Sequence, residues 1–199
     1  MIAAALLLIA GDPETALDAE RAFSTAAQVE GQWAAFRRFA DADAVIFMPA
    51  PANPHRALPA EEPPIAVQWW PARSFVSCDG SMAVNTGSWA RPHASGYFST
   101  VWERQPDGSW KWALDHGDIV DGGRALPERV EVRTADCSAV PPVAVIPSLG
   151  ARQGNGASRD GTLRWGWTVF DDGSRRFFTN LWNGSAFERV IYDEVGSGA

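Results

Sequence analysis

The segment YFSTVWERQPDGSWKWALDHGD, residues 97–118, contains two runs with the composition of β-strands on either side of one turn. Asp107, Gly108 and Ser109 form the turn, because Asp-Gly is a dipeptide that readily accepts the positive φ angles of a type I′ hairpin. The aromatic and β-branched residues on both sides predict long antiparallel strands. We therefore expect a sheet built from hairpins.

A strand over residues 110–118 places alternate side chains on opposite faces of the sheet. On one face, His116 follows an aromatic wall and Asp118 can orient it, which makes this pair the candidate catalytic acid and base. That face holds Trp110, Trp112, Leu114, His116 and Asp118, and the other holds Lys111, Ala113 and Asp115. The alternative is that His116 is a polar plug at a sheet edge, with the aspartates starting a turn.

Asp-Gly or Asn-Gly followed by Ser or Thr occurs at four further places in the chain, and each triplet lies between apolar stretches. The triplets begin at Asp79, Asp107, Asp160, Asp172 and Asn183. We therefore expect five hairpins. The strands predicted for the first part of the chain span residues 65–70, 73–77, 82–89, 96–104 and 110–116.

Helices are predicted before these strands. Asp12 is the expected N-cap of a helix that begins with Pro13 and Glu14, since proline and acidic residues suit the first turn. The helical pattern runs through TALDAERAFSTAAQ (15–28), and a second short helix covers QWAAFRRFA (32–40). The run DADAVIFMP (41–49) predicts a strand, and the proline-rich residues 50–64 predict a long loop.

The C-terminal part of the chain has its own β pattern. Residues 122–156 are expected to be an irregular linker, and residues 157–195 a three-stranded meander that packs on the main domain. Its strands are TLRWGWTVF, RRFFTNLW and AFERVIYDEV. The main domain is assigned to residues 12–121.

Composition excludes several classes of function. The chain has 199 residues, a net charge of −7 and 46% hydrophobic residues including ten tryptophans, so it can build a core. No block of lysine and arginine is present to attract nucleic acid or anionic lipid. There is no G-x-S-x-G, P-loop or dinucleotide-binding motif. We expect no cofactor, and no metal, because His55 and His93 lie in loops beside prolines.

The N-terminal apolar run, residues 2–10, is too short to cross a bilayer as a helix but fits the core of a signal peptide. We expect residues 1–11 to be a signal-peptide remnant of a periplasmic or secreted protein. The alternative is that the run extends the first helix of a cytoplasmic protein. In an oxidising compartment, Cys78 and Cys137 can form a disulfide that stabilises the fold by about 4 kcal/mol; otherwise they are two buried thiols.

The order of these elements resembles the SnoaL-like branch of the nuclear transport factor 2 superfamily. The resemblance covers roughly residues 12–118 and rests on FRRFADADAVIFMP (36–49), AVNTGSW (83–89) and the segment 97–118. It implies an α+β fold in which a curved antiparallel sheet packs on N-terminal helices and forms a cone, with an apolar pocket at its open end and a C-terminal β-meander outside the family pattern. Homodimers are common in this superfamily, so a homodimer is implied as well.

Fold alone does not decide function, because this superfamily includes isomerases, dehydratases, epoxide hydrolases, cyclases and non-catalytic proteins. The first hypothesis is a pocket that binds a small apolar molecule; its expected lining residues are Trp33, Tyr97, Ser99, Trp110 and Trp112. The second is a module for protein interaction or structure. The third is an isomerase or dehydratase with His116 as general acid and base, for which Tyr97, Ser99 and Trp69 are candidate hydrogen-bond donors.

Overall fold

The computed structural model describes residues 13–142 and 152–197. The described elements are three helices and eleven strands, in this order: α1 (Ala16–Val29), α2 (Gln32–Phe39), β1 (Ala40–Met48), β2 (Ala50–Ala52), α3 (Pro54–Ala57), β3 (Gln68–Val76), β4 (Met82–Arg91), β5 (Ala94–Arg104), β6 (Trp110–Ile119), β7 (Glu131–Thr134), β8 (Arg152–Ala157), β9 (Leu163–Val169), β10 (Arg175–Trp182) and β11 (Phe187–Val195). Asp12 and the apolar run 2–10 lie outside the described residues.

Both main helices are capped by side-chain oxygens. The prediction that the first helix begins with Pro13 and Glu14 is wrong, because Thr15 is the N-cap of α1 and its hydroxyl accepts the backbone N–H of Asp18. The first turn of α2 is capped from a distance, since the Glu62 carboxylate accepts the backbone N–H groups of Trp33 (2.7 Å) and Ala34 (2.8 Å). This contact attaches the proline-rich loop to α2.

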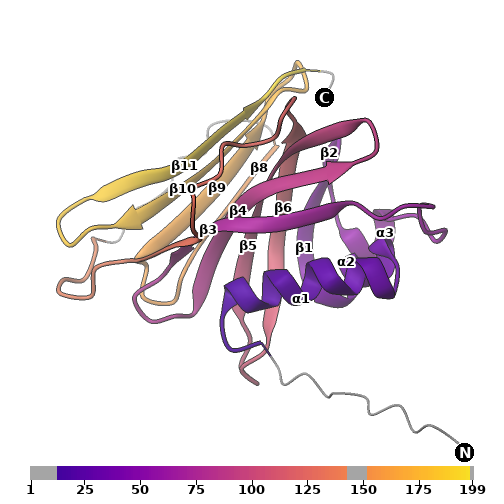
Figure 1. Ribbon diagram of the computed structural model, residues 1–199. Helices are drawn as coiled ribbons and strands as arrows, with labels where there is room; N and C mark the ends of the chain where they lie inside the picture. The colour runs from indigo at the N-terminus through magenta and orange to yellow at the C-terminus, as the bar shows by residue number, and fades with distance from the viewer. Residues whose placement is uncertain (1–12, 143–151, 198–199) are drawn as a thin grey trace, which may run out of the picture.

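The first seven strands of the chain form one mixed sheet in the order β2-β1-β6-β5-β4-β3-β7. Its central pairs are antiparallel, but β1 runs parallel to β6 and β7 runs parallel to β3. The expectation of a purely antiparallel sheet is therefore wrong at both sides, where the pairing joins segments that are distant in the sequence. The fold is α+β, and the sheet is not closed (Figure 1).

The C-terminal residues form a second, antiparallel sheet in the order β11-β10-β9-β8. It has four strands where three were expected, because β8 forms within the segment predicted to be irregular. Two glycines, Gly154 and Gly156, hid this strand in the sequence. They are required there, since an added Cβ would lie 2.5 Å from the Trp167 indole at the first and 2.7 Å from the Trp165 indole at the second.

All five Asx-Gly turns connect the hairpins that the sequence predicts, but they are not type I′ turns. Only the glycine of each triplet has a positive φ angle; in the first two, Gly80 has φ +64° and Gly108 has φ +89°. The preceding Asx side chain accepts a hydrogen bond from the backbone of the following Ser or Thr, as Asp107 does from Ser109 (2.9 Å). This local bond suits an Asx residue with negative φ, and one left-handed glycine closes the turn.

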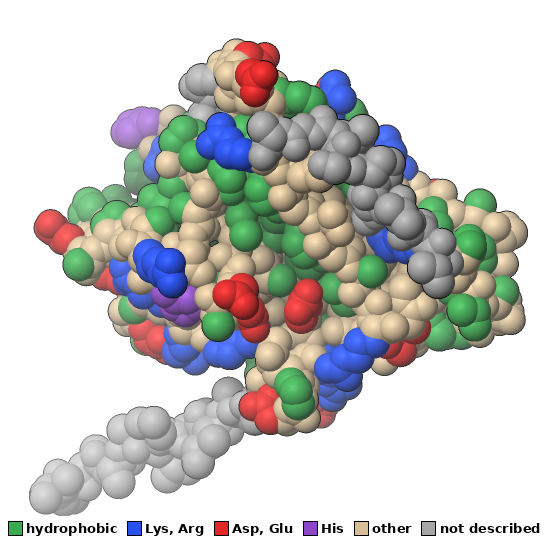
Figure 2. All heavy atoms as spheres, turned by 180° about the vertical axis from the view of Figure 1, so that it is seen from behind, with side chains coloured by type: hydrophobic (Ala, Val, Ile, Leu, Met, Phe, Trp, Pro, Cys, Tyr) green, Lys and Arg blue, Asp and Glu red, His purple; other side chains and the backbone are tan. Residues whose placement is uncertain are grey.

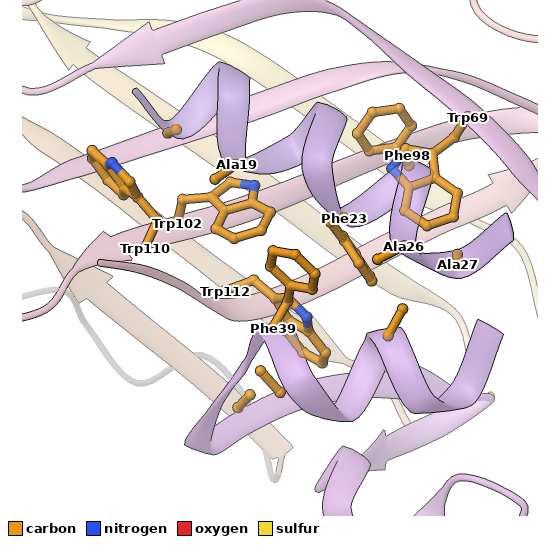
Figure 3. Packing of buried hydrophobic residues seen from close by; sticks show 14 of the residues in the cluster. Ala19, Phe23, Ala26, Ala27, Phe39, Trp69, Phe98, Trp102, Trp110 and Trp112 are labelled. Carbon is orange, nitrogen blue, oxygen red and sulfur yellow. The ribbon is translucent and has the colours of Figure 1, made fainter. Parts of the chain in front are cut away.

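Two apolar cores lie on opposite faces of the seven-stranded sheet. One joins Phe23 of α1 and Phe39 of α2 to Trp69, Trp102 and Trp112 of the sheet (Figure 3). The other joins the opposite face of the same sheet to the second sheet; its members include Phe75, Val84, Val101, Leu114, Leu163, Trp165 and Phe177. Figure 1 shows the resulting order of layers, with helices, central sheet and second sheet.

A β-bulge in β6 decides which residues face which core. Trp112 pairs with Trp102 while Leu114 pairs with Val101, so Ala113 is an extra residue in the ladder. The predicted single face is therefore broken: Trp112 belongs to the helix-side core and Leu114 to the core between the sheets. Residues beyond the bulge face the side opposite to the one that simple alternation predicts.

A disulfide joins the segments that follow β3 and β7 of the first sheet, and a pair of turns beside it connects the second sheet to the first. Cys78 and Cys137 are joined, with 5.4 Å between their Cα atoms. Beside the disulfide, the β3–β4 turn meets the β8–β9 turn, where the Asp79 backbone N–H donates to the Asp160 carboxylate (2.8 Å) and the Cys78 backbone N–H to the Thr162 hydroxyl (2.9 Å). Within the described part of the chain, no helix is long and apolar enough to cross a membrane.

Candidate functional site

A cavity of about 220 Å³ lies on the helix side of the central sheet. Its walls are mostly apolar and come from α2, β3, β4, β5 and β6; their aromatic members include Phe36, Trp69, Trp89 and Phe98. Arg91 and Asp115 are the two ionisable side chains on this wall, since His116 faces the other side of the sheet. Arg91 is exposed at the end of β4, and Asp115 is half-buried on β6.

Asp115 is placed in the cavity by the bulge at Ala113, which turns its side chain to the helix side. The Thr100 hydroxyl donates a hydrogen bond to Asp115 Oδ2 at 2.9 Å. Burial raises the pKa of Asp115 to about 7, although the bond from Thr100 favours the charged form. A carboxyl group with such a pKa exchanges protons readily at neutral pH.

A second carboxyl group, Glu20 of α1, is fully buried near Asp115. Its oxygens accept hydrogen bonds from the indole N–H groups of Trp69 (2.9 Å) and Trp102 (2.6 Å), and from the amide of Asn85 (3.3 Å). Burial raises the pKa of Glu20 to about 7; the bond from Trp102 opposes this shift and the nearby charge of Asp115 adds to it. Glu20 thus links α1 to three strands and supports the Trp69 wall of the cavity.

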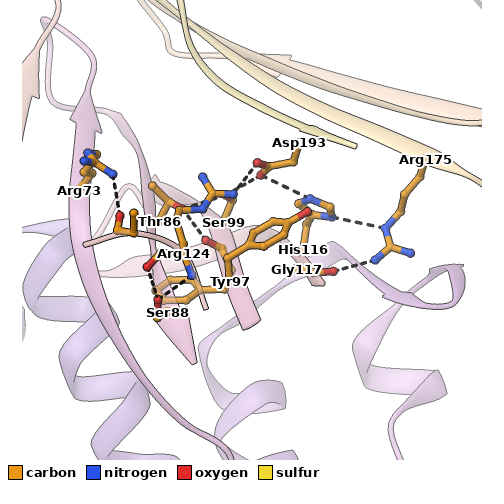
Figure 4. A network of polar contacts seen from close by, with 12 residues as sticks. Arg73, Thr86, Ser88, Tyr97, Ser99, His116, Gly117, Arg124, Arg175 and Asp193 are labelled. Atoms are coloured by element: carbon orange, nitrogen blue, oxygen red, sulfur yellow. Dashed lines mark hydrogen bonds and ion pairs between the residues drawn. The ribbon is translucent and has the colours of Figure 1, made fainter. Parts of the chain in front are cut away.

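His116 lies on the opposite face of the sheet, in a polar network between the two sheets (Figure 4). Its side chain has no solvent exposure, and its Nε2 is 3.5 Å from Oδ2 of Asp193 on β11. On its other side, Arg175 of β10 directs Nε to His116 Nδ1 (3.4 Å) and donates through Nη2 to the Gly117 carbonyl (2.7 Å). The ring is enclosed by aromatic side chains, with Phe177 at 5.2 Å between centroids.

The pKa values of His116 and Asp193 are both lowered in this network, for different reasons. Burial lowers the pKa of His116 below its usual range, although Asp193 acts in the other direction, so the imidazole is neutral at neutral pH. Burial alone would raise the pKa of Asp193, but the bond to His116 and the charge of Arg124 outweigh it and lower that pKa. Arg124 pairs directly with Asp193, and Ser99 donates to the same carboxylate at 3.1 Å.

The residues predicted from the sequence to form one site lie on two faces of the sheet. Tyr97 and Ser99 are with His116 between the sheets, and Asp118 accepts the neighbouring backbone N–H of Ile119. The three predicted tryptophans are on the helix side: Trp33 packs against the helix-side core, and Trp110 and Trp112 belong to it. Among the predicted residues, Trp69 alone lines the cavity of 220 Å³ with its side chain.

Several charged residues at these sites were missed by sequence reasoning, and Asp115, Arg175 and Asp193 show why. Asp115 was assigned to the wrong face because the pattern does not reveal the bulge at Ala113. Arg175 and Asp193 come from the C-terminal sheet and resemble ordinary strand residues; their strands were predicted, but not the sheet-to-sheet packing that brings them to His116. The signal available in the sequence was an arginine at the start of the aromatic-rich strand RRFFTNLW.

Among residues 13–142 and 152–197, no group of three His, Cys, Asp or Glu side chains is placed to bind a metal ion. On the face shown in Figure 2, lysine and arginine side chains are scattered among acidic and hydrophobic ones. Comparison of the chain with models of known protein families found no match, and comparison with curated proteins found none either.

Proposed function

We propose that this protein binds a small, mostly apolar molecule in the cavity between α2 and the central sheet. The observation that carries the proposal is a cavity of about 220 Å³ with mostly apolar walls and one half-buried carboxyl group, Asp115. Concave apolar sites with few polar groups are the usual form of small-molecule pockets. The resemblance to the SnoaL-like branch, with its cone-shaped domain and pocket at the open end, supports this assignment.

The size of the cavity limits the ligand. An apolar cavity of about 150 Å³ accommodates benzene, so 220 Å³ suits a molecule with one ring or two compact rings. Trp69 and Trp89 offer flat apolar surfaces against which such a ring packs. At neutral pH, a substantial fraction of Asp115 is protonated and donates a hydrogen bond to a carbonyl or hydroxyl oxygen of the ligand.

A second candidate function is proton transfer to the bound molecule, as in an isomerase or dehydratase. The observation that favours it is the pKa of Asp115, about 7 in a pocket wall, which suits a general acid or base. His116, the residue expected for this role from the sequence, is enclosed between the two sheets. In this proposal Asp115 takes the role instead, and His116 is a structural residue.

We also propose that the protein is exported and forms a homodimer. The disulfide between Cys78 and Cys137 supports export, since such bonds persist in oxidising compartments. A homodimer is proposed from the resemblance alone. A module for protein interaction is the competing hypothesis, and a cavity that binds no small molecule would favour it.

Binding is tested with a matched pair of variants. Val67 lines the cavity, and Val130 is an exposed valine in the segment after β6. We expect the Val67→Trp variant to fill the cavity and to lose binding of neutral aromatic probes such as cinnamamide, measured by calorimetry, while Val130→Trp binds as the wild type does. Native mass spectrometry of the purified protein then searches for a co-purifying ligand. Equal binding by both variants would exclude this cavity as the site.

A further inference from the structure

Arg175 is a buried cation without a carboxylate partner. Its exposed fraction is 7%, and within the described residues no Asp or Glu oxygen lies within 4.0 Å of its guanidinium. Its contacts are neutral: the imidazole of His116, the carbonyl of Gly117 and the ring of Phe47 at 5.1 Å. Arginine remains charged in proteins, and buried charges are normally paired. Arg124, its counterpart in the same network, is paired with Asp193.

The position of Arg175 explains its neutral contacts. Pairing between β1 and β6 ends at Ile46 and Asp115, although β6 continues to Ile119. Beyond this point the edge of β6 is open, and the Gly117 carbonyl is satisfied by Arg175 Nη2 at 2.7 Å (Figure 4). The bonds to His116 and Gly117 use two of the five N–H groups of the guanidinium, so three are left for another acceptor.

A second cavity, of about 470 Å³, opens beside this guanidinium. Its wall includes Arg175, Asp118 and the apolar side chains of Phe47 and Met48. It shares Trp89, Gly117 and Ile119 with the cavity that contains Asp115, so the two spaces adjoin at the open end of β6. A ligand can thus place an apolar ring against Trp89 and extend a polar group toward Arg175.

We propose that the ligand of this protein is an aromatic or other apolar carboxylic acid whose carboxylate binds Arg175, an inference that rests on the proposed pocket function. A guanidinium fork matches the two oxygens of a carboxylate and provides both charge and orientation. The apolar walls accommodate the body of the acid. Asp118 acts on Arg175 only as a nearby charge, so the ligand carboxylate supplies the direct ion pair that Arg175 lacks within the described residues.

Asp118 gives the proposal a second, independent consequence. Its carboxylate lines the same cavity and accepts the Ile119 backbone N–H at 2.7 Å. A bound carboxylate is repelled by this charge, and a neutral ligand is not. Removal of the charge should therefore strengthen the binding of acids and leave the binding of amides unchanged.

The test compares matched acids and amides, cinnamate with cinnamamide and benzoate with benzamide, by isothermal titration calorimetry. We expect the wild type to prefer each acid by roughly 10- to 100-fold, as a charged hydrogen bond requires. Arg175→Gln should abolish this preference and keep the affinity for the amides, and Arg175→Lys should keep part of it. Asp118→Asn should raise the affinity for acids about two- to fivefold.

The outcomes separate the two proposals. Equal affinity of acid and amide in the wild type, unchanged in Arg175→Gln, would overturn the assignment of Arg175 and leave the pocket function standing. Binding of neither kind of probe would overturn both. If Arg175→Gln also loses its affinity for the amides, the Asp118→Asn variant distinguishes the two explanations. A higher affinity of Asp118→Asn for acids supports the proposal, and an unchanged affinity overturns it. Competition by inorganic phosphate as strong as by benzoate would indicate a simple anion site and contradict the carboxylic acid.

Discussion

The imidazole Nε2 of His116 lies 3.5 Å from Oδ2 of Asp193, and the two residues belong to different sheets. Asp193 also pairs with Arg124, in the segment that follows β6, and accepts the Ser99 hydroxyl of β5. One carboxylate therefore joins β11 to three parts of the central domain. Because these partners are buried or half-buried, water screens their interactions with Asp193 only weakly, and the loss of the carboxylate should destabilise the fold.

We expect Asp193→Asn to lower the free energy of unfolding by about 2–4 kcal/mol, because it leaves the guanidinium of Arg124 without its counter-charge. The neighbouring Glu194→Gln is the control. Glu194 forms an exposed pair with Arg176, so its loss should change stability by less than about 1 kcal/mol. Urea unfolding at pH 7 measures both, and an equal effect of the two substitutions would contradict a structural role for the buried network.

Protonation of His116 should destabilise the protein. Burial lowers its pKa in the folded state, so the unfolded chain binds the proton more readily. Stability from the neutral imidazole is complete above the unfolded pKa of about 6.5 and is lost as the pH falls through the lower, folded value. The stability advantage of the wild type over His116→Gln should thus shrink between pH 7 and pH 5 in urea unfolding.

The exposed His93, which has φ +66° in the β4–β5 turn, provides the comparison for this pH effect. Asparagine is tolerated at such a φ angle, so His93→Asn should follow the wild type at every pH. A constant difference between the wild type and His116→Gln over this range would show that His116 does not titrate with a lowered pKa.

Glu20 should give a pH dependence of the opposite sign. Its pKa of about 7 exceeds the value of 4.5 for an unperturbed glutamate, so the folded protein holds its proton more tightly. The protonated Glu20 therefore contributes up to about 3 kcal/mol to the free energy of unfolding. This contribution is complete below pH 4.5 and is lost as the pH rises through 7. Glu20→Gln removes it and leaves one of the three N–H donors without an acceptor, at a cost of about 1–3 kcal/mol.

The measurement is the difference in unfolding free energy between the wild type and Glu20→Gln, which should narrow as the pH rises from 5 to 8. Glu61→Gln, at an exposed position in the loop, should show no such trend. If the Glu20→Gln difference instead widened with pH, the carboxyl group would have a lowered pKa, stabilised by its hydrogen bonds more than it is disfavoured by burial.

The sequence predicts local structure here better than it predicts the site. Turn triplets such as Asp107-Gly108-Ser109 specify hairpins through hydrogen bonds within three residues. The five hairpins can therefore be predicted from local sequence alone. The parallel pairing of β1 with β6 depends on contacts between distant segments and leaves no periodic signal.

The candidate site depends on two such features. The single extra residue Ala113 turns Asp115 toward the cavity and His116 away from it. The alternation of side chains along a strand does not reveal such an inserted residue in the sequence. Arg175 and Asp193 reach the site only because the second sheet packs on the first. Their strands are predictable from alternation, while the face against which they pack is not.

Two Asp-Gly turns of the same kind should differ in their contribution to stability. Asp160 and Asp172 both start Asp-Gly turns and accept hydrogen bonds from their own turns. Asp160 also accepts the backbone N–H of Asp79 at 2.8 Å, across the contact between the two sheets. We therefore expect Asp172→Ala to lower the free energy of unfolding by about 1 kcal/mol and Asp160→Ala by about 2–3 kcal/mol. Urea unfolding of both variants measures the difference, and equal losses would mean that the contact between the turns does not hold the second sheet in place.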